Sequence, residues 1–185
     1  MKRKMHLLLV LAGLTLGYAS DVAGAAEIPQ QAFQAEYVLT GPGGMSIHKI
    51  ACDGKGHGRS EIISPSRRSV SIADYANKQV NICTPGLGTL SVPLDDKMMD
   101  SMNAFNKNMK ANSKPLGSKL IDGHMCTGTH YDLDAGYEEL WTGNDIGGAR
   151  VYSKVEMPNY GVTEAHLKSF SRVAPGPEMF VLPNR

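Results

Sequence analysis

The feature that most constrains this chain is a repeated alternation of apolar and polar residues in short runs. From Phe33 to Leu39 the apolar residues occupy every second position, which is the period of a strand with one buried face. A similar run from Met45 to Cys52 ends at Asp53-Gly54, a strong signal for a hairpin turn. Strand-like runs joined by tight turns predict an antiparallel sheet.

The same pattern continues through most of the chain. Further runs with strand composition, separated by turn residues, cover 59–64, 69–75, 79–83, 89–92, 117–121, 124–133, 138–142, 149–157 and 162–173. A sheet of up to eleven strands is expected to curl rather than to remain flat. The sequence therefore predicts a mainly β fold in which a curved antiparallel sheet forms an unclosed half-barrel.

The clearest late run is 149–157. Strict alternation places Val151, Ser153, Val155 and Met157 on one face and Arg150, Tyr152, Lys154 and Glu156 on the other. The pattern predicts that Val151 and Val155 share the interior of the sheet.

One segment has a helical period instead. Apolar side chains recur at intervals of three and four residues, at Met98, Met102, Phe105 and Met109. Asp95 and Asp96 suit the start of a helix and Lys110 suits its end, while Ser113 and Pro115 are expected to close it. We expect the sheet to curl around this one principal helix or to lie against it.

The first 25 residues predict export. A basic start at residues 2–4 precedes an apolar run, Leu7 to Leu16, and Ala23-Gly24-Ala25 supplies small residues for a cleavage site. A permanent membrane span needs about 20 residues, more than this run offers. We expect a signal peptide cleaved near Ala25, a single domain over residues 26–185, no lipid anchor because no Cys follows the cleavage point, and a periplasmic location.

Composition and motifs argue against several functions. The 19 Lys and Arg residues are balanced by 18 Asp and Glu residues, which is not the electrostatic pattern of a nucleic-acid binder. The chain has no Gly-x-Ser-x-Gly string, no His-Glu-x-x-His helix and no phosphate-binding glycine motif. We expect no enzymatic activity, no cofactor, no nucleic-acid partner and no permanent membrane anchor.

Three cysteines remain in the mature chain. In an oxidising compartment their number predicts one disulfide and one free thiol. The sequence does not choose a pair among Cys52, Cys83 and Cys126. Three reduced thiols are the alternative if no two of them lie within bonding distance.

The order of several segments carries a family resemblance. These segments are Phe33–Tyr37, the turn Cys52–Gly56, Gly117–Gly123 with Cys126 and Tyr131, Leu140–Thr142 with Val151-Tyr152, and the closing Pro175–Pro183. In this order they resemble the superfamily of outer-membrane lipoprotein carriers, LolA and its relatives LolB and LppX. The resemblance implies an unclosed barrel, covered by helices, that holds acyl chains in an apolar cavity.

The leading hypothesis is a soluble, non-enzymatic periplasmic protein that binds acyl chains, lipids or lipidated proteins. The side chains expected to line its interior are Phe33, Tyr37, Leu39, Met98, Met102, Phe105, Met109, Val151 and Val155. The same residues are the expected core, because the sequence does not separate a packed core from a cavity.

Two alternatives stay open. A periplasmic metal-binding protein would use His124, Cys126 and His130, joined by His48 or His57. In a regular strand Cys126 and His130 stand roughly 13 Å apart, so a shared ion requires a bulge at Gly128. A structural accessory domain without a small ligand is the other alternative.

Overall fold

The structure is a computed structural model that describes residues 31–182, apart from the side chains of residues 102, 103, 105 and 106. The predicted signal peptide, residues 1–25, lies outside the described residues. Within the described part the chain is mainly β, as the alternation predicted. The strands are β1 (Phe33–Gly41), β2 (Gly44–Cys52), β3 (His57–Ile63), β4 (Arg68–Asp74), β5 (Gln79–Thr84), β6 (Gly88–Pro93), β7 (Ser113–Ile121), β8 (His124–Leu133), β9 (Gly136–Gly143), β10 (Ala149–Met157) and β11 (Gly161–Ser171).

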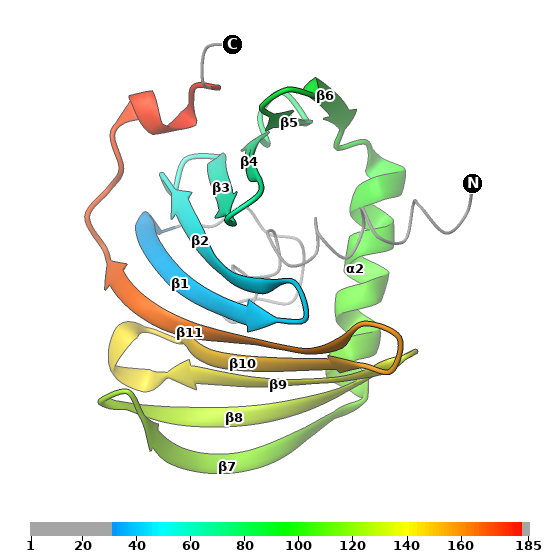
Figure 1. The fold of residues 1–185 in the computed structure, drawn as a ribbon, viewed down its shortest axis with the longest axis vertical. Coiled ribbons are helices and arrows are strands. Elements are labelled where there is room, and N and C mark those ends of the chain that lie inside the picture. Colours follow the sequence, from blue (N-terminus) through cyan, green and yellow to red (C-terminus); the bar gives the residue numbers. More distant parts are fainter. Residues whose placement is uncertain (1–30, 183–185) are drawn as a thin grey trace.

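The described strands form one 11-stranded antiparallel sheet, in the order β6-β5-β4-β3-β2-β1-β11-β10-β9-β8-β7. Two meanders, β1 to β6 and β7 to β11, are joined side by side where β1 pairs with β11. The outermost strands β6 and β7 are the two edges, so the curved sheet is unclosed (Figure 1). The prediction of a curved, open antiparallel sheet is confirmed.

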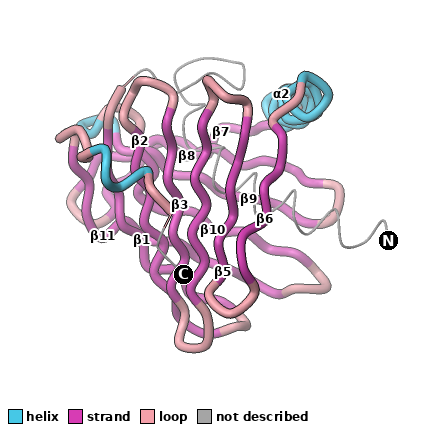
Figure 2. The backbone as a smooth tube through the Cα atoms, turned by 90° about the horizontal axis from the view of Figure 1, so that it is seen from above, coloured by secondary structure: helices cyan, strands magenta, loops and turns pink. Residues whose placement is uncertain are grey.

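Helix α2 (Asp96–Ala111) connects the two edge strands. Asp95 caps its start by accepting a hydrogen bond from the Met98 backbone N–H at 2.8 Å, and Lys110 lies in its last turn. The helix contacts β8 and stands outside the strands instead of being enclosed by them (Figure 2). Of the two predicted arrangements, the one in which the sheet curls around the helix is therefore wrong, because a helix that joins both edge strands crosses the open side. The helix lies against the sheet at β8, which is the other predicted arrangement.

None of the helices within residues 31–182 is both long and apolar enough to cross a membrane. Besides α2 they are the short 3-10 helices η2 (Asn144–Ile146) and η3 (Pro177–Phe180). The segment that carries η3 rises from the end of β11 and lies against β3 (Figure 1). There the Arg59 guanidinium donates to the Met179 carbonyl at 3.0 Å.

Cross-strand pairing assigns each strand side chain to one of two faces of the sheet. We call the inner face the one that carries Tyr37, paired with His48, and Ile50, paired with Ser60; these four side chains are buried. The opposite, outer face carries ion pairs, among them those of Glu36 with Lys49 and Lys168. The outer face also carries fully buried side chains, among them Val70 and Cys126, so both faces of the sheet contribute to the core.

A bulge in β10 changes which side chains reach the inner face. Arg150 pairs with Thr142, but Tyr152 pairs with the neighbouring Trp141, so one extra residue, Val151, stands between them. Arg150 consequently turns to the inner face, where its guanidinium lies over the Tyr37 ring. Val151 packs on the outer face instead, so Val151 and Val155 do not share a face as strict alternation predicted.

Val151 belongs to an apolar cluster with Cys126 and Trp141. Trp141 lies opposite Gly128 in the β8–β9 pair, and a Cβ at Gly128 would come within 2.6 Å of the indole ring. The absence of a side chain at Gly128 therefore provides the space that the indole fills. The Lys119 ammonium also lies over the ring, 3.9 Å from its centroid.

Replacing Gly128 with Ala is expected to lower the free energy of unfolding by about 2–3 kcal/mol, because the new methyl group overlaps the Trp141 ring. Gly58→Ala in β3 is the matched control, since its Cβ would meet only the Ala73 methyl at 3.9 Å. Urea denaturation should show the control within about 0.5 kcal/mol of the wild type. Equal destabilisation of both variants would contradict this account of the cluster.

Candidate functional site

A row of buried polar side chains crosses the inner face. We call it the polar row: Ser153, Arg150, Tyr37, His48 and Ser60, which come from β10, β1, β2 and β3 and are between 2% and 7% exposed. Since β11 lies between β10 and β1, Arg150 reaches across that strand to Tyr37. Burying polar groups costs free energy, so the gathering of five buried polar side chains on one line marks this part of the sheet.

Arg150 is the charged member of the polar row. Its guanidinium carbon lies 4.3 Å from the centroid of the Tyr37 ring, a cation–π contact, and its Nη1 donates to the Ser153 hydroxyl at 3.2 Å. Burial lowers the pKa of Arg150 well below its ordinary value. An arginine nevertheless keeps its proton under physiological conditions, so the polar row carries a positive charge.

The other end of the polar row is a histidine–serine pair. His48 Nε2 lies 2.8 Å from Ser60 Oγ, and the His48 and Tyr37 rings are 6.4 Å apart. Burial lowers the pKa of His48 to about 4 and raises that of Tyr37. Both rings are therefore neutral near pH 7 and serve as hydrogen-bonding groups.

Apolar side chains flank the polar row. A cluster of buried and half-buried residues surrounds Tyr37: Ala35, Ile50, Phe33, Leu39, Leu167 and Phe170. The Phe33 and Phe170 rings stack with their centroids 6.2 Å apart. The inner face thus carries a cluster of apolar side chains directly beside the polar row.

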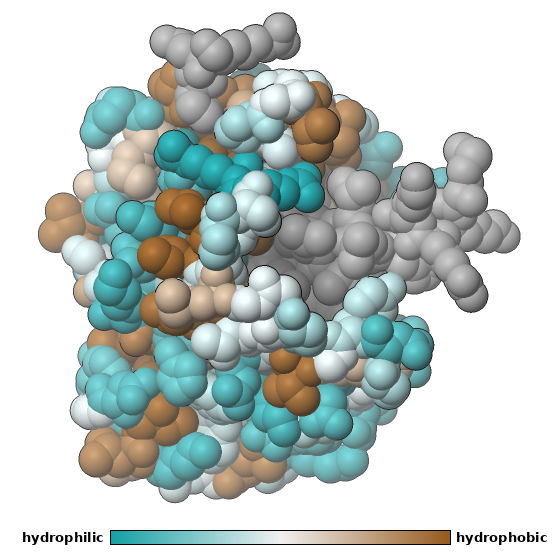
Figure 3. Space-filling model, viewed as in Figure 1, coloured by the Kyte–Doolittle hydropathy of each residue, from teal (hydrophilic) through white to brown (hydrophobic). Residues whose placement is uncertain are grey.

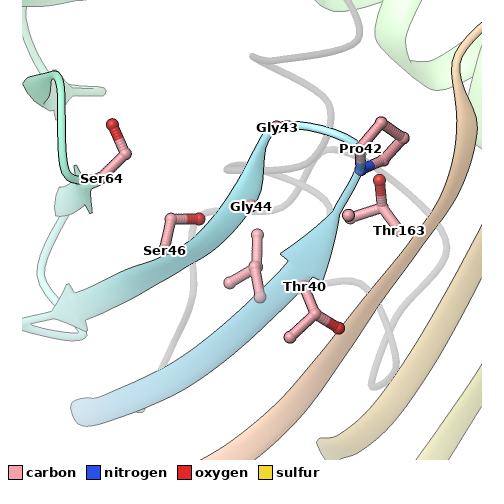
Figure 4. Close-up of a pocket in the computed structure, with 9 residues that line it drawn as sticks. Thr40, Pro42, Gly43, Gly44, Ser46, Ser64 and Thr163 are labelled. Atoms are coloured by element: carbon pink, nitrogen blue, oxygen red, sulfur yellow. The ribbon is translucent and has the colours of Figure 1, made fainter.

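A pocket of about 270 Å³ opens at the end of this face, beside the β1–β2 hairpin. Leu39, Ser46 and Thr163 contribute to its lining, and Ser64 at the end of β3 lies across from Ser46 (Figure 4). The lining has hydroxyl groups and no ionisable side chain. This pocket gives the edge of the inner face an opening to solvent.

A second hollow, of about 340 Å³, lies on the outer face beside η3. Glu61 there receives hydrogen bonds from Arg59 at 3.1 Å and from Arg68 at 2.6 Å. Burial alone would raise the pKa of Glu61, but the hydrogen bonds from the two arginines have the larger effect, and the pKa is lowered from its ordinary value. On the side of the molecule seen in Figure 3, hydrophobic residues also form small separate groups among hydrophilic ones. The inner face is therefore the better candidate for an apolar ligand.

The structure brings some of the predicted lining residues together. Phe33, Tyr37 and Leu39 belong to one cluster, and Val155 lies on the same inner face by its pairing with Thr163. Met98 and Met109 are half-buried on α2, whereas the side chains of Met102 and Phe105 lie outside the described part. Val151 is in the other cluster, on the outer face.

The predicted metal ligands each have a different environment. His124 pairs with Asp145 at 2.7 Å, His130 pairs with Asp132 at 3.1 Å, and Cys126 is fully buried beside Trp141. His57 pairs with Asp53 at 2.7 Å, while His48 belongs to the polar row. Among the described residues, no group of three His, Cys, Asp or Glu side chains could hold a metal ion.

The three cysteines are buried and form no disulfide within residues 31–182, so the prediction of a disulfide is wrong and the alternative of three reduced thiols holds. Cys52 on β2 and Cys83 on β5 are separated by two strands, or roughly 14 Å, and they lie on opposite faces. Cys126 on β8 lies five strands from β2 in the sheet order. A disulfide requires Cα atoms within about 7 Å of each other.

Only Tyr37 of the polar row was among the predicted lining residues, and His48 and Arg150 were missed for different reasons. His48 shares a face with Ile50 and Cys52 in a regularly alternating strand, so its burial was detectable in the sequence. Arg150 was placed on the opposite face because alternation alone gives no sign of the bulge at Val151. Gly147 and Gly148, in the turn before β10, are the nearest residues in the sequence that suggest an irregularity in this strand.

No family model and no curated protein sequence matches this chain. Solved structures do match it. An uncharacterised conserved protein of Thermus thermophilus aligns with a TM-score of 0.63 at 11% identity, over 94% of each chain. MucB of Pseudomonas aeruginosa, in its complex with MucA, aligns with a TM-score of 0.56 at 16% identity, over 83% of this chain and 56% of MucB.

The chain has the LolA-like fold. This fold is the one that the order of its segments resembled, and at such low identities the matches show the fold alone. LppX of Mycobacterium tuberculosis aligns with a TM-score of only 0.43 and adds nothing to the assignment. The chain spans just over half the length of MucB.

The mature protein is expected to contain three reduced thiols. Thiol titration of the denatured chain without a reductant should count all three, and the native chain should react slowly because each thiol is buried. One thiol per denatured chain, with a mass two daltons below the reduced value, would instead show a disulfide.

His48 is expected to make the protein less stable in mild acid. Below about pH 6.5, the ordinary pKa of histidine, His48 is protonated in the unfolded chain. In the folded chain it stays neutral down to about pH 4, so acid favours the unfolded chain. From about pH 7 to about pH 5 the wild type should lose about 1–2 kcal/mol more stability than His48→Gln. Urea denaturation at the two pH values measures this, and parallel losses would contradict the burial of a neutral ring.

Proposed function

We propose that this chain is a periplasmic binding protein that holds the acyl chain of a lipid, or of a lipidated protein, against the inner face of its sheet. The observation that carries the proposal is the apolar cluster around Tyr37 on the inner face of an open, LolA-like sheet. Apolar ligands gain most of their binding free energy from leaving water for such a lining.

The topology supports entry of an extended ligand. Among the described strands β6 and β7 do not pair, so this side of the sheet is open there, and α2 connects the two edges. The pocket at Leu39 and Thr163 adds an opening at the end of the same face. An acyl chain can therefore approach the inner face without the sheet coming apart.

The compartment and the nature of the partner are also proposals. The basic and apolar start of the sequence supports export to the periplasm. MucB was solved in a complex with MucA, so a protein is the other kind of partner that we consider for this chain. No step of this function requires a catalytic group or a cofactor.

Native mass spectrometry of the protein purified from the periplasm tests the function directly. We expect the folded protein to carry added mass that denaturation releases as a fatty acyl species. Release of a peptide would favour a MucA-like partner, and a bare chain that also binds no added lipid would favour a structural domain.

Two neighbouring substitutions test the face that binds. Leu39→Glu places a charge on the inner face and is expected to weaken binding of a fluorescent fatty acid at least tenfold, whereas Val38→Glu on the outer face should leave it unchanged. Leu39→Trp adds apolar bulk without charge and covers the case in which Leu39→Glu fails to fold. Equal binding by all three variants would place the ligand elsewhere.

A further inference from the structure

We propose that the ligand carries an anionic head group, a carboxylate or a phosphate, and that the polar row holds this head while the apolar lining holds the chain. This inference rests on the proposed function. It adds the chemical class of the ligand, which neither the fold nor the likeness to MucB specifies.

The charges on the inner face support an anion. By cross-strand pairing, the charged side chains that the described strands direct to this face are Arg150 and Glu138. Glu138 stands four residues along β9 from Thr142, the partner of Arg150, which is roughly 13 Å. The polar row therefore has a local positive charge, although the face as a whole is balanced.

The donors of the polar row suit a carboxylate or a phosphate. A guanidinium offers planar N–H groups that match both anions, and hydroxyl groups can donate to the remaining oxygen atoms. Ser60 Oγ lies at one end of the row beside His48, and Ser153 Oγ lies at the other end beside Arg150. Ser71 on β4 pairs with Ser60 and continues the line of hydroxyl groups.

Because Arg150 is buried, its charge favours an anionic group over a neutral one more strongly than an exposed charge would. Arg150 is 4% exposed, so an anion beside it would be attracted through protein rather than through water. Arg150, Tyr37 and His48 also have partners within the chain, and an anion would join or replace these contacts. Phe33, Ile50 and Leu39 lie on the same face beside the row, where they would contact the chain of the ligand.

The test compares ligands with one chain and different heads. The delipidated mature protein is titrated with laurate, dodecanol and dodecyltrimethylammonium, each displacing a fluorescent fatty acid. We expect laurate to bind at least about tenfold more tightly than dodecanol, and the cation to bind most weakly. Acetate and inorganic phosphate should not displace the probe, because a free anion lacks the chain.

Arg150→Met should bring laurate and dodecanol within about twofold of each other while dodecanol binding is retained. Lys154→Met is the matched control, since Lys154 lies on the same strand but on the outer face, and it should keep the wild-type preference. Ser60→Ala should reduce the preference a few-fold and covers the case in which Arg150→Met does not fold.

The outcomes separate the two proposals. Equal binding of laurate and dodecanol by the wild type overturns the anionic head but leaves an acyl-binding protein. An unchanged preference in Arg150→Met also overturns it. Displacement of the probe by acetate or phosphate alone would show a site for free anions, and binding of none of the three amphiphiles would remove the proposed function itself.

Discussion

The arrangement of the inner face depends on one extra residue in β10. In a regular strand, successive side chains alternate between faces, so every residue from Ala149 onward would have a fixed side. The bulge at Val151 lets Arg150 turn inward while Tyr152, two positions on, stays outside. Without it, the guanidinium would lie among the lysines and carboxylates of the outer face, and the Tyr37 ring would have no cation over it.

The same bulge completes the packing on the outer face. Val151 enters the cluster of Cys126 and Trp141, which a regular strand would have left short of an aliphatic side chain. On β8, Gly128 has no side chain and so leaves room for the indole of Trp141. Further register shifts occur at Glu36/Tyr37 and at Pro115/Gly117, and bulges of this kind add the twist that bends a long sheet. Curvature and side-chain placement are thus consequences of the same local irregularities.

The fold was largely predictable because the strands and turns are encoded by neighbouring residues in the sequence. The site was not predictable because it depends on which strands pair and in which register. Alternation and turn residues located the strands, and they placed Tyr37 and Leu39 on one face. Ser113 and Pro115 suggested the end of a helix, but they begin β7, an edge strand that tolerates proline because one side makes no ladder. The count of cysteines suggested a disulfide, whereas pairing depends on the distance between strands. Arg150 depends on a register shift that leaves no mark in composition.

A buried guanidinium is a poor way to stabilise a sheet. Removing its charge from water costs free energy that contacts inside the protein only partly return, so an apolar side chain of similar length could cover the Tyr37 ring with no net loss of stability. The apolar cluster around Tyr37 already supplies the packing that this part of the fold requires. An anionic ligand of the kind proposed would add a further partner for this guanidinium, and on that proposal the bulge in β10 places Arg150 for binding.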